Sequence, residues 1–343
     1  MSNLYIIMVV SAGISFLITP LIRKFAINVN AVDVPKDNRR VHNKPTPYLG
    51  GLAIYVSFFI TFFIQAKSLQ KSDFGIILGA TIIVIGGVID DFIDIKPWIK
   101  LIFQLSAAII LILCGVNISI VTNPFDSINI FYNIGWISYP LTILWVVGIT
   151  NALNLIDGLD GLAAGVAFIS CITIFVIALL NGRFEAAILL AILSGAILGF
   201  LPFNFNPASI FMGDAGAQLL GFLLAAISMQ GAIKSATAFA MGVPVLAIGL
   251  PIYDTIFAII RRKINGKPIS QGDKGHLHHR LLEMGLSQKQ AVIVMYTISA
   301  VLGIISIIAM EISTVRSYFL LTGVLIIIVL AAWKFGLFKL KDS

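Results

Sequence analysis

Hydrophobic stretches of helix length recur along almost the whole chain, and they constrain the fold more than any other feature. A transmembrane α-helix needs about 20 consecutive, mostly apolar residues. The 343-residue chain has a mean hydropathy of +1.01 and only 11% charged residues, whereas soluble domains contain roughly a quarter. The stretches are continuous and do not alternate over ten residues, so they predict helices and not barrel strands. The sequence therefore predicts an all-α integral membrane protein.

About eleven of these stretches predict a polytopic bundle of transmembrane helices. We expect the helices near residues 3–25, 50–66, 74–90, 98–115, 139–156, 161–180, 185–203, 214–230, 236–260, 291–309 and 316–336. No internal repeat or soluble second domain is visible, so residues 1–343 are expected to form a single domain. Its cytoplasmic loops are expected at about 26–49, 91–97, 157–160, 204–213 and 261–290.

Basic residues are concentrated on one side of this bundle. If the N-terminus lies outside, the inner segments hold all of the 23 Lys and Arg residues except Lys67, Lys71, Arg183, Lys234 and Arg316. Because cytoplasmic loops carry an excess of Lys and Arg, the N-terminus is predicted to lie outside and the C-terminus inside. The one sizeable outer loop, residues 116–138, alternates apolar and polar residues and predicts a short hairpin.

The same orientation gathers polar residues from separate stretches on the cytoplasmic side. These are the acids of the D-D-F-I-D segment, the polar residues of 154–160, Asp214, Asp254 and the histidines of 276–279. Structural polar residues would divide between the two sides, so the pattern predicts a cytoplasmic-face active site. An ion-coupled secondary transporter is the alternative from another class, but transporters bind near the middle of the membrane and often contain repeats.

The most specific segment is N-A-L-N-L-I-D-G-L-D-G-L-A-A-G, residues 151–165, where Asn151, Asn154, Asp157 and Asp160 recur every third residue. On a helix, such spacing places side chains near one face. Amide and carboxylate oxygens suit a hard cation or a sugar nucleotide. The alternative is a kinked helical hairpin with hydrated aspartates.

Two further segments carry acids. Asp90, Asp91 and Asp94 repel one another unless a divalent cation or a cationic group neutralises them, although a hydrated helix end is the simpler interpretation. Asp214 begins a predicted helix after F-M-G, where backbone amides and the helix dipole favour a phosphate or carboxylate. Phe211 either stacks on a base or anchors the helix at the membrane interface.

The segment H-L-H-H-R-L, residues 276–281, follows Lys274 in a basic loop. No matching cysteines or H-E-x-x-H helix complete a zinc site, so contact with a pyrophosphate is the stronger hypothesis and a hydrated basic loop the alternative. Cys114 and Cys171 lie in apolar stretches and are expected to pack as small apolar side chains.

In this order, D-D-F-I-D, N-A-L-N-L-I-D-G-L-D-G-L-A, F-M-G-D-A-G and H-L-H-H-R-L resemble the polyprenyl-phosphate N-acetylhexosamine-1-phosphate transferases. The histidine segment is more similar to the TagO/WecA branch, which takes UDP-GlcNAc, than to MraY, the phospho-MurNAc-pentapeptide transferase. The resemblance implies transfer of GlcNAc-1-phosphate from UDP-GlcNAc to undecaprenyl phosphate in the bacterial cell membrane, as the first membrane step of wall teichoic acid or related surface-glycan synthesis. It also implies a homodimer surrounded by membrane lipids, with no nucleic-acid partner.

The resemblance further implies roles for individual residues. The cofactor would be Mg²⁺, with Mn²⁺ as the alternative, held by Asp214, Asp91 and Asn154. The catalytic residues would be Asp90, Asp91 and Asp157, with Asp90 or Asp91 acting on the lipid phosphate. The substrate-binding residues would be Asn154, Asp160, Asn204, Phe211, Lys100, His276, His278, His279, Arg280, Lys44 and Thr46, although K-P-T-P is shifted from the pattern expected of MraY.

Overall fold

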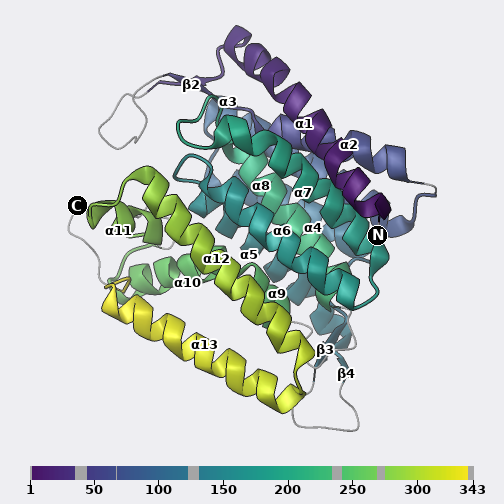
Figure 1. The fold of residues 1–343 in the computed structure, drawn as a ribbon, viewed down its shortest axis with the longest axis vertical. Coiled ribbons are helices and arrows are strands. Elements are labelled where there is room, and N and C mark those ends of the chain that lie inside the picture. Colours follow the sequence, from purple (N-terminus) through teal and green to yellow (C-terminus); the bar gives the residue numbers. More distant parts are fainter. Residues whose placement is uncertain are drawn as a thin grey trace.

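The computed structural model describes residues 2–34, 45–66, 68–122, 131–233, 242–268 and 275–338. Most residues of this part of the chain lie in helices, and its strands form only two short two-stranded sheets (Figure 1). The prediction of an all-α fold is therefore confirmed.

The helices and strands of the described residues follow in chain order. They are α1 (Ser2–Asn28), β1 (Val32–Asp33), β2 (Thr46–Pro47), α2 (Gly51–Gln65), α3 (Lys71–Ile93), α4 (Pro97–Leu113), β3 (Ile120–Thr122), β4 (Phe131–Asn133), η1 (Gly135–Ile137), α5 (Ser138–Ile156), α6 (Leu162–Leu180), α7 (Phe184–Asn204), α8 (Gly213–Ser228), η2 (Met229–Ile233), α9 (Gly242–Ala247), α10 (Gly249–Ile264), α11 (Leu277–Glu283), α12 (Gln288–Glu311) and α13 (Thr314–Lys334).

Among the described residues, seven helices are long and apolar enough to cross a membrane, and α2 and α4 are shorter apolar helices. The chain is thus a multi-pass membrane protein. The prediction of one continuous helix at 236–260 is wrong, because α9 and α10 are separated at Ile248. Residues 236–241 of the predicted helix lie outside the described part. Pro251 explains the break, since it has no N–H to donate to Ala247 and its ring opposes that carbonyl.

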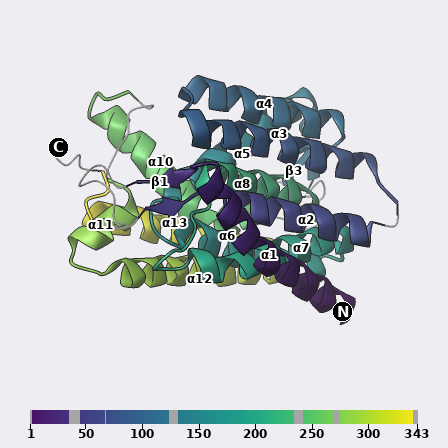
Figure 2. The same cartoon turned by 90° about the horizontal axis from the view of Figure 1, so that it is seen from above.

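The two ends of the bundle carry different elements. The N-terminus and the β3–β4 hairpin lie at one end, whereas β1, β2 and α11 lie at the other (Figures 1 and 2). The predicted hairpin is confirmed by the antiparallel pairing of Ile120 with Asn133 and Thr122 with Phe131, and its tip lies outside the described residues.

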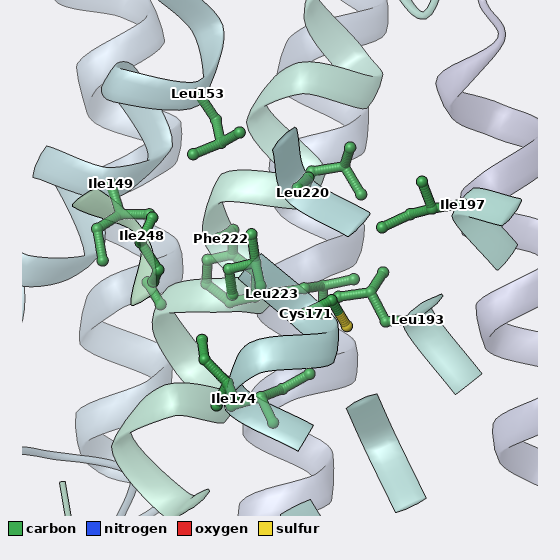
Figure 3. Packing of buried hydrophobic residues seen from close by; sticks show 14 of the residues in the cluster. Ile149, Leu153, Cys171, Ile174, Leu193, Ile197, Leu220, Phe222, Leu223 and Ile248 are labelled. Carbon is green, nitrogen blue, oxygen red and sulfur yellow. The ribbon is translucent and has the colours of Figure 1, made fainter. Parts of the chain in front are cut away.

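Helix α8 forms the centre of the bundle, since every residue from Ala215 to Ser228 is buried. Small residues allow neighbouring helices to approach it closely: a Cβ at Gly87 of α3 would lie 2.3 Å from the Ala215 Cα, and one at Gly51 of α2 would lie 2.2 Å from the Gly216 Cα. Phe222 packs against α3, where a Cβ at Gly79 would lie 2.3 Å from its ring. Leu220 and Leu223 of α8 lie beside residues of α6 and α7 (Figure 3). Cys171 packs there as a buried apolar residue, as predicted.

Candidate active site

A cavity of about 500 Å³ opens where the sequence-distant polar segments meet. Its walls come from the β1–β2 region, the ends of α3, α5 and α7, the start of α8, and α11. The lining side chains include the carboxylates of Asp33, Asp91, Asp157, Asp160 and Asp214. The structure thus brings together the acidic segments that the sequence analysis singled out, and it concentrates negative charge in one place.

The most specific sequence segment supplies one wall of this cavity, but it is not a continuous helix. Helix α5 ends at Ile156, Asp157 caps it, and α6 begins only at Leu162. Gly161 adopts φ of +77°, which L-residues rarely adopt. The predicted helices at 139–156 and 161–180 and the loop at 157–160 are therefore confirmed, and only Asn151 and Asn154 share a helix face. Asp157 and Asp160 lie instead on the turn that lines the cavity.

The start of α8 faces Asp91 from α3. The Asp214 backbone N–H donates to Asp91 Oδ1 at 2.8 Å, and the Ala215 N–H donates to Asp91 Oδ2 at 3.3 Å. Gly213, with φ of +74°, makes this approach possible, because a Cβ there would lie 2.7 Å from Asp91 Oδ2. The anion expected at this helix start is thus a carboxylate of the protein itself.

Lys100 joins two carboxylates beside the cavity. Its Nζ lies 2.7 Å from Asp214 Oδ2 and also forms an ion pair with Asp90. Asp90 is only 5% exposed and accepts a further bond at 3.0 Å from the Ile95 N–H. Asp90 therefore lies behind the cavity wall, and its neutralisation depends on Lys100.

The neighbouring carboxylates repel the charge of Asp157. Burial, together with the charges of Asp214, Asp91 and Asp160, raises its pKa to about 8. Like charges disfavour one another's ionised forms, so a cation in this space would relieve the repulsion.

The oxygen atoms around the cavity fit a magnesium ion. Asn154 forms a hydrogen bond with Asp214, while its buried Oδ1 has no partner in the described part of the chain. Within that part, no three His, Cys, Asp or Glu side chains are grouped closely enough to hold a metal by themselves. Mg²⁺ does not require such a group, because it retains several waters and usually binds one or two carboxylates together with substrate phosphates. The donors therefore suit Mg²⁺ better than zinc.

The loop from Asn204 to Gly213 forms a rigid wall. Asp160 Oδ2 accepts bonds from Asn206 Nδ2 at 2.9 Å and from the Ala208 N–H at 3.0 Å. The Asn204 amide, which lines the cavity, donates to the Ile210 carbonyl at 3.1 Å. Phe211 also lines it, and its backbone bonds to Pro47 and Gly50 hold the loop against the segment after β2.

The histidines have three different environments. His279 lines the cavity. His278 is 1% exposed and packs against Gly158, and burial and the neighbouring His279 lower its pKa to about 3. His276 lies further away, with its Nδ1 2.7 Å from Asp254 Oδ2. Arg280 donates to the backbone carbonyls of Gly275 and Phe335.

Other residues of the prediction lie beside the cavity or elsewhere. Thr46 is buried in β2 and does not line it, and Lys44 lies outside the described residues. Three residues that the sequence did not single out, Asp33, Tyr48 and Gln288, line the cavity. The pairing of Asp33 with Thr46 brings the first of these to the site, and local sequence carries little signal for such a contact.

The fold and the cavity define an all-α membrane protein with a carboxylate-lined site at one end of its bundle. Residues 74–232 match glycosyl transferase family 4. A probable undecaprenyl-phosphate N-acetylglucosaminyl 1-phosphate transferase of Bacillus subtilis (strain 168) is 39% identical over 99% of this chain and 94% of its own length. The chain therefore belongs to the family of polyprenyl-phosphate N-acetylhexosamine-1-phosphate transferases.

Two further relatives show the breadth of this family. A decaprenyl-phosphate N-acetylglucosaminephosphotransferase of Mycolicibacterium smegmatis is 35% identical over 83% of this chain and 77% of its own. A phospho-N-acetylmuramoyl-pentapeptide-transferase of Halalkalibacterium halodurans is 31% identical over 89% of this chain and 96% of its own.

Proposed function

We propose that the protein transfers GlcNAc-1-phosphate from UDP-GlcNAc to undecaprenyl phosphate, giving undecaprenyl-pyrophosphoryl-GlcNAc and UMP. The observation that carries the proposal is the convergence of Asp91, Asp157 and Asp214 on one cavity at the end of a membrane-spanning bundle. The 39% identity with the Bacillus relative favours this donor over the muramoyl-pentapeptide donor. Initiation of wall teichoic acid or a related surface glycan is the corresponding role.

The reaction joins two anions, and this explains the composition of the site. An oxygen of the lipid phosphate bonds to the β-phosphorus of UDP-GlcNAc, the bond from that phosphorus to the bridging oxygen breaks, and UMP leaves. Catalysis of this kind depends mainly on positioning and on charge stabilisation. Lys100 would provide fixed positive charge beside the phosphates, and His279 is the histidine on the cavity wall suited to contact them.

Asp214, Asp91 and Asn154 would hold Mg²⁺, with Mn²⁺ as the alternative. When bound, the ion screens the pyrophosphate oxygens and stabilises their developing charge. The unpartnered Asn154 Oδ1 and the raised pKa of Asp157 support this assignment.

Asp157 is the carboxylate best suited to move a proton. Asp90 is held by Lys100 and the Ile95 N–H, and Asp91 by the backbone of α8. Asp157 lines the cavity, and a cation bound there would relieve the repulsion that raises its pKa, so that the carboxylate is ionised and able to accept a proton. Asp157 would therefore take the proton of the lipid phosphate, while Asp90 and Asp91 fix Lys100 and the start of α8.

The remaining walls would bind the donor. Asn204, Phe211 and Asp160 suit the nucleotide, since they combine an amide, an aromatic ring and a carboxylate on one fixed loop. His276, His278 and Arg280 would support this region through the backbone and packing contacts of α11. Thr46, in β2, would border the site, and Lys44, outside the described residues, stays a prediction of the family resemblance.

We further propose a bacterial cell-membrane protein of about eleven spans, with an external N-terminus and a cavity that faces the cytoplasm. The distribution of Lys and Arg along the sequence supports this orientation, because the loops assigned to the cytoplasmic side hold most of them. Homodimer formation stays a prediction of the family resemblance.

One assay tests the reaction directly. Purified protein in detergent is mixed with undecaprenyl phosphate, Mg²⁺ and labelled UDP-GlcNAc, UDP-GalNAc or UDP-MurNAc-pentapeptide. We expect label from UDP-GlcNAc to become extractable into butanol, UMP to be released, and excess EDTA to stop transfer until Mg²⁺ is restored. Release of UDP would indicate transfer of a bare sugar and refute the proposal, and transfer with the pentapeptide donor alone would move the protein to the muramoyl branch.

A further inference from the structure

Three amide side chains meet one helical turn deeper in the bundle than the candidate site. Each follows or precedes a site residue by three or four positions on the same helix: Gln104 follows Lys100 on α4, Gln218 follows Asp214 on α8, and Asn151 precedes Asn154 on α5. Residues at this spacing occupy the same helix face. The three amides, here called the amide triad, therefore form a layer one turn beneath Lys100, Asn154 and Asp214.

Hydrogen bonds connect the amide triad across the three helices. Asn151 Nδ2 donates to Gln104 Oε1 at 2.7 Å, and Gln104 Nε2 donates back to Asn151 Oδ1 at 3.3 Å. Gln104 Nε2 also donates to Gln218 Oε1 at 3.1 Å. Gln104 and Gln218 are only 1% and 2% exposed, so these bonds lie in the interior.

Hydrogen-bonded amides in the interior resist the sliding of one helix along another more strongly than apolar side chains do. Apolar contacts tolerate a small sliding of one helix along another, whereas a hydrogen bond weakens once its atoms leave a narrow range of distance and angle. A bonded amide network therefore fixes the axial positions of α4, α5 and α8 relative to one another. The residues one turn above it need that accuracy, because Lys100 reaches Asp214 at 2.7 Å and Asn154 bonds to the same carboxylate.

We infer that Gln104, Asn151 and Gln218 are positioning residues that set the register of the three helices carrying Lys100, Asn154 and Asp214. The inference rests on the proposed function, because its consequence is measured as transfer. It assigns the amide triad no contact with substrate.

Removing one member of the amide triad and removing all three have different consequences. A single Gln104→Leu removes the donor to the buried Gln218 Oε1 and one of the two acceptors of Asn151 Nδ2, which keeps its bond to the Val147 carbonyl, and this lowers stability. The triple variant Gln104→Leu, Asn151→Leu and Gln218→Leu replaces every partner by an apolar group and is expected to regain much of the thermal stability. If the amide triad positions the site, kcat of the triple variant stays at least about tenfold below wild type. The Mg²⁺ concentration needed for half-maximal rate rises, while KM for UDP-GlcNAc changes little.

Ser57→Ala is the matched control, because it also removes a buried hydrogen bond between helices, from Ser57 to Ser11. It should lower the melting temperature without changing kcat or the Mg²⁺ requirement. Gln218→Met is a second and milder test, since Gln104 retains its bonds with Asn151. It is expected to reduce kcat and raise the Mg²⁺ requirement in a folded protein.

Recovery of both stability and kcat in the triple variant would overturn the inference, and so would an unchanged kcat and Mg²⁺ requirement in Gln218→Met. Wild-type protein in the same assay separates the two failures. Wild type without transfer overturns the proposed function and the inference with it, whereas active wild type beside unaffected variants overturns the inference alone.

Discussion

Lys100 illustrates how one side chain serves both stability and chemistry. Its ammonium group is the partner of the buried Asp90 and of Asp214, two carboxylates that would otherwise repel each other. Breaking a buried ion pair by removing one partner leaves an uncompensated charge, which costs more than removing both partners. The stability and transfer functions of Lys100 can be separated on this basis.

We predict that Lys100→Met lowers the free energy of unfolding by roughly 3 kcal/mol, since Asp90 is left buried without its cation. Transfer should fall at least about a hundredfold, because charge beside the phosphates is lost. The double variant Lys100→Met and Asp90→Asn should regain stability but not transfer, as measured by thermal unfolding and UMP release. Recovery of transfer in the double variant would show that the charge of Lys100 does not contribute to catalysis.

His278 predicts a specific dependence of stability on pH. Its pKa is about 3 in the folded protein and near 6.5 in the unfolded chain. The unfolded state therefore binds more protons between these values, so stability falls as the pH drops below about 6.5. At pH 5 this group alone should cost about 2 kcal/mol. The melting temperature should fall less between pH 7.5 and 5 in His278→Gln than in wild type, and equal falls would contradict the prediction.

Only some of the residues that line the cavity could be predicted from the sequence. Asp91, Asp157 and Asp214 were predictable because each interrupts or ends a long apolar stretch, where a charge is costly without a function. Asp33 and Gln288 were not, because they follow or begin such stretches in polar surroundings where charge is ordinary. Their place at the cavity depends on the packing of β1 and α12, which local spacing does not encode.

At the scale of elements, the approach of α3 to α8 determines the geometry of the site. Gly87 lies where these helices touch, one turn before Asp91, and the same approach brings Asp91 to the backbone N–H of Asp214. Any side chain at Gly87 must push the backbones apart. The packing of the two helices and the carboxylate geometry are therefore coupled.

We predict that Gly87→Ala destabilises the protein by about 1–3 kcal/mol through overpacking and reduces transfer together with stability. The matched control is Gly148→Ala on α5, where a Cβ meets nothing within 4 Å. Replacing this helical glycine by alanine should raise the free energy of unfolding of the protein by about 0.5–1 kcal/mol and leave transfer unchanged. Thermal unfolding and UMP release in parallel measure both effects, and wild-type behaviour of Gly87→Ala would show that the helices can separate without cost.

Helix positions were largely predictable, because apolar length is a local property that the sequence displays directly. The break at Ile248 was missed although Pro251 stands in the sequence, since hydrophobicity continues unbroken across it. The turn after Ile156 was predicted as the loop at 157–160, because the polar residues there interrupt the apolar stretch and Gly158 and Gly161 favour a turn.

Within the whole molecule, β1 and α11, which carry residues that line the cavity, lie at the opposite end of the bundle from the β3–β4 hairpin (Figures 1 and 2). The proposed reaction needs the cavity on the side that holds soluble UDP-GlcNAc. The distribution of Lys and Arg along the sequence supports that side as the cytoplasm. The orientation of the molecule is thus a physical requirement of the proposed function.

Single cysteines test this orientation in a variant whose Cys114 and Cys171 are replaced by alanine. Tyr132→Cys lies in the exposed hairpin, and Lys263→Cys is exposed at the end of α10. In intact cells, a membrane-impermeant maleimide should label the hairpin cysteine, whereas the α10 cysteine should react only after permeabilisation. Both variants must retain wild-type transfer, since neither position lines the cavity. The reverse labelling pattern would place the cavity outside, where UDP-GlcNAc is absent, and would contradict the proposed reaction at the level of the whole molecule.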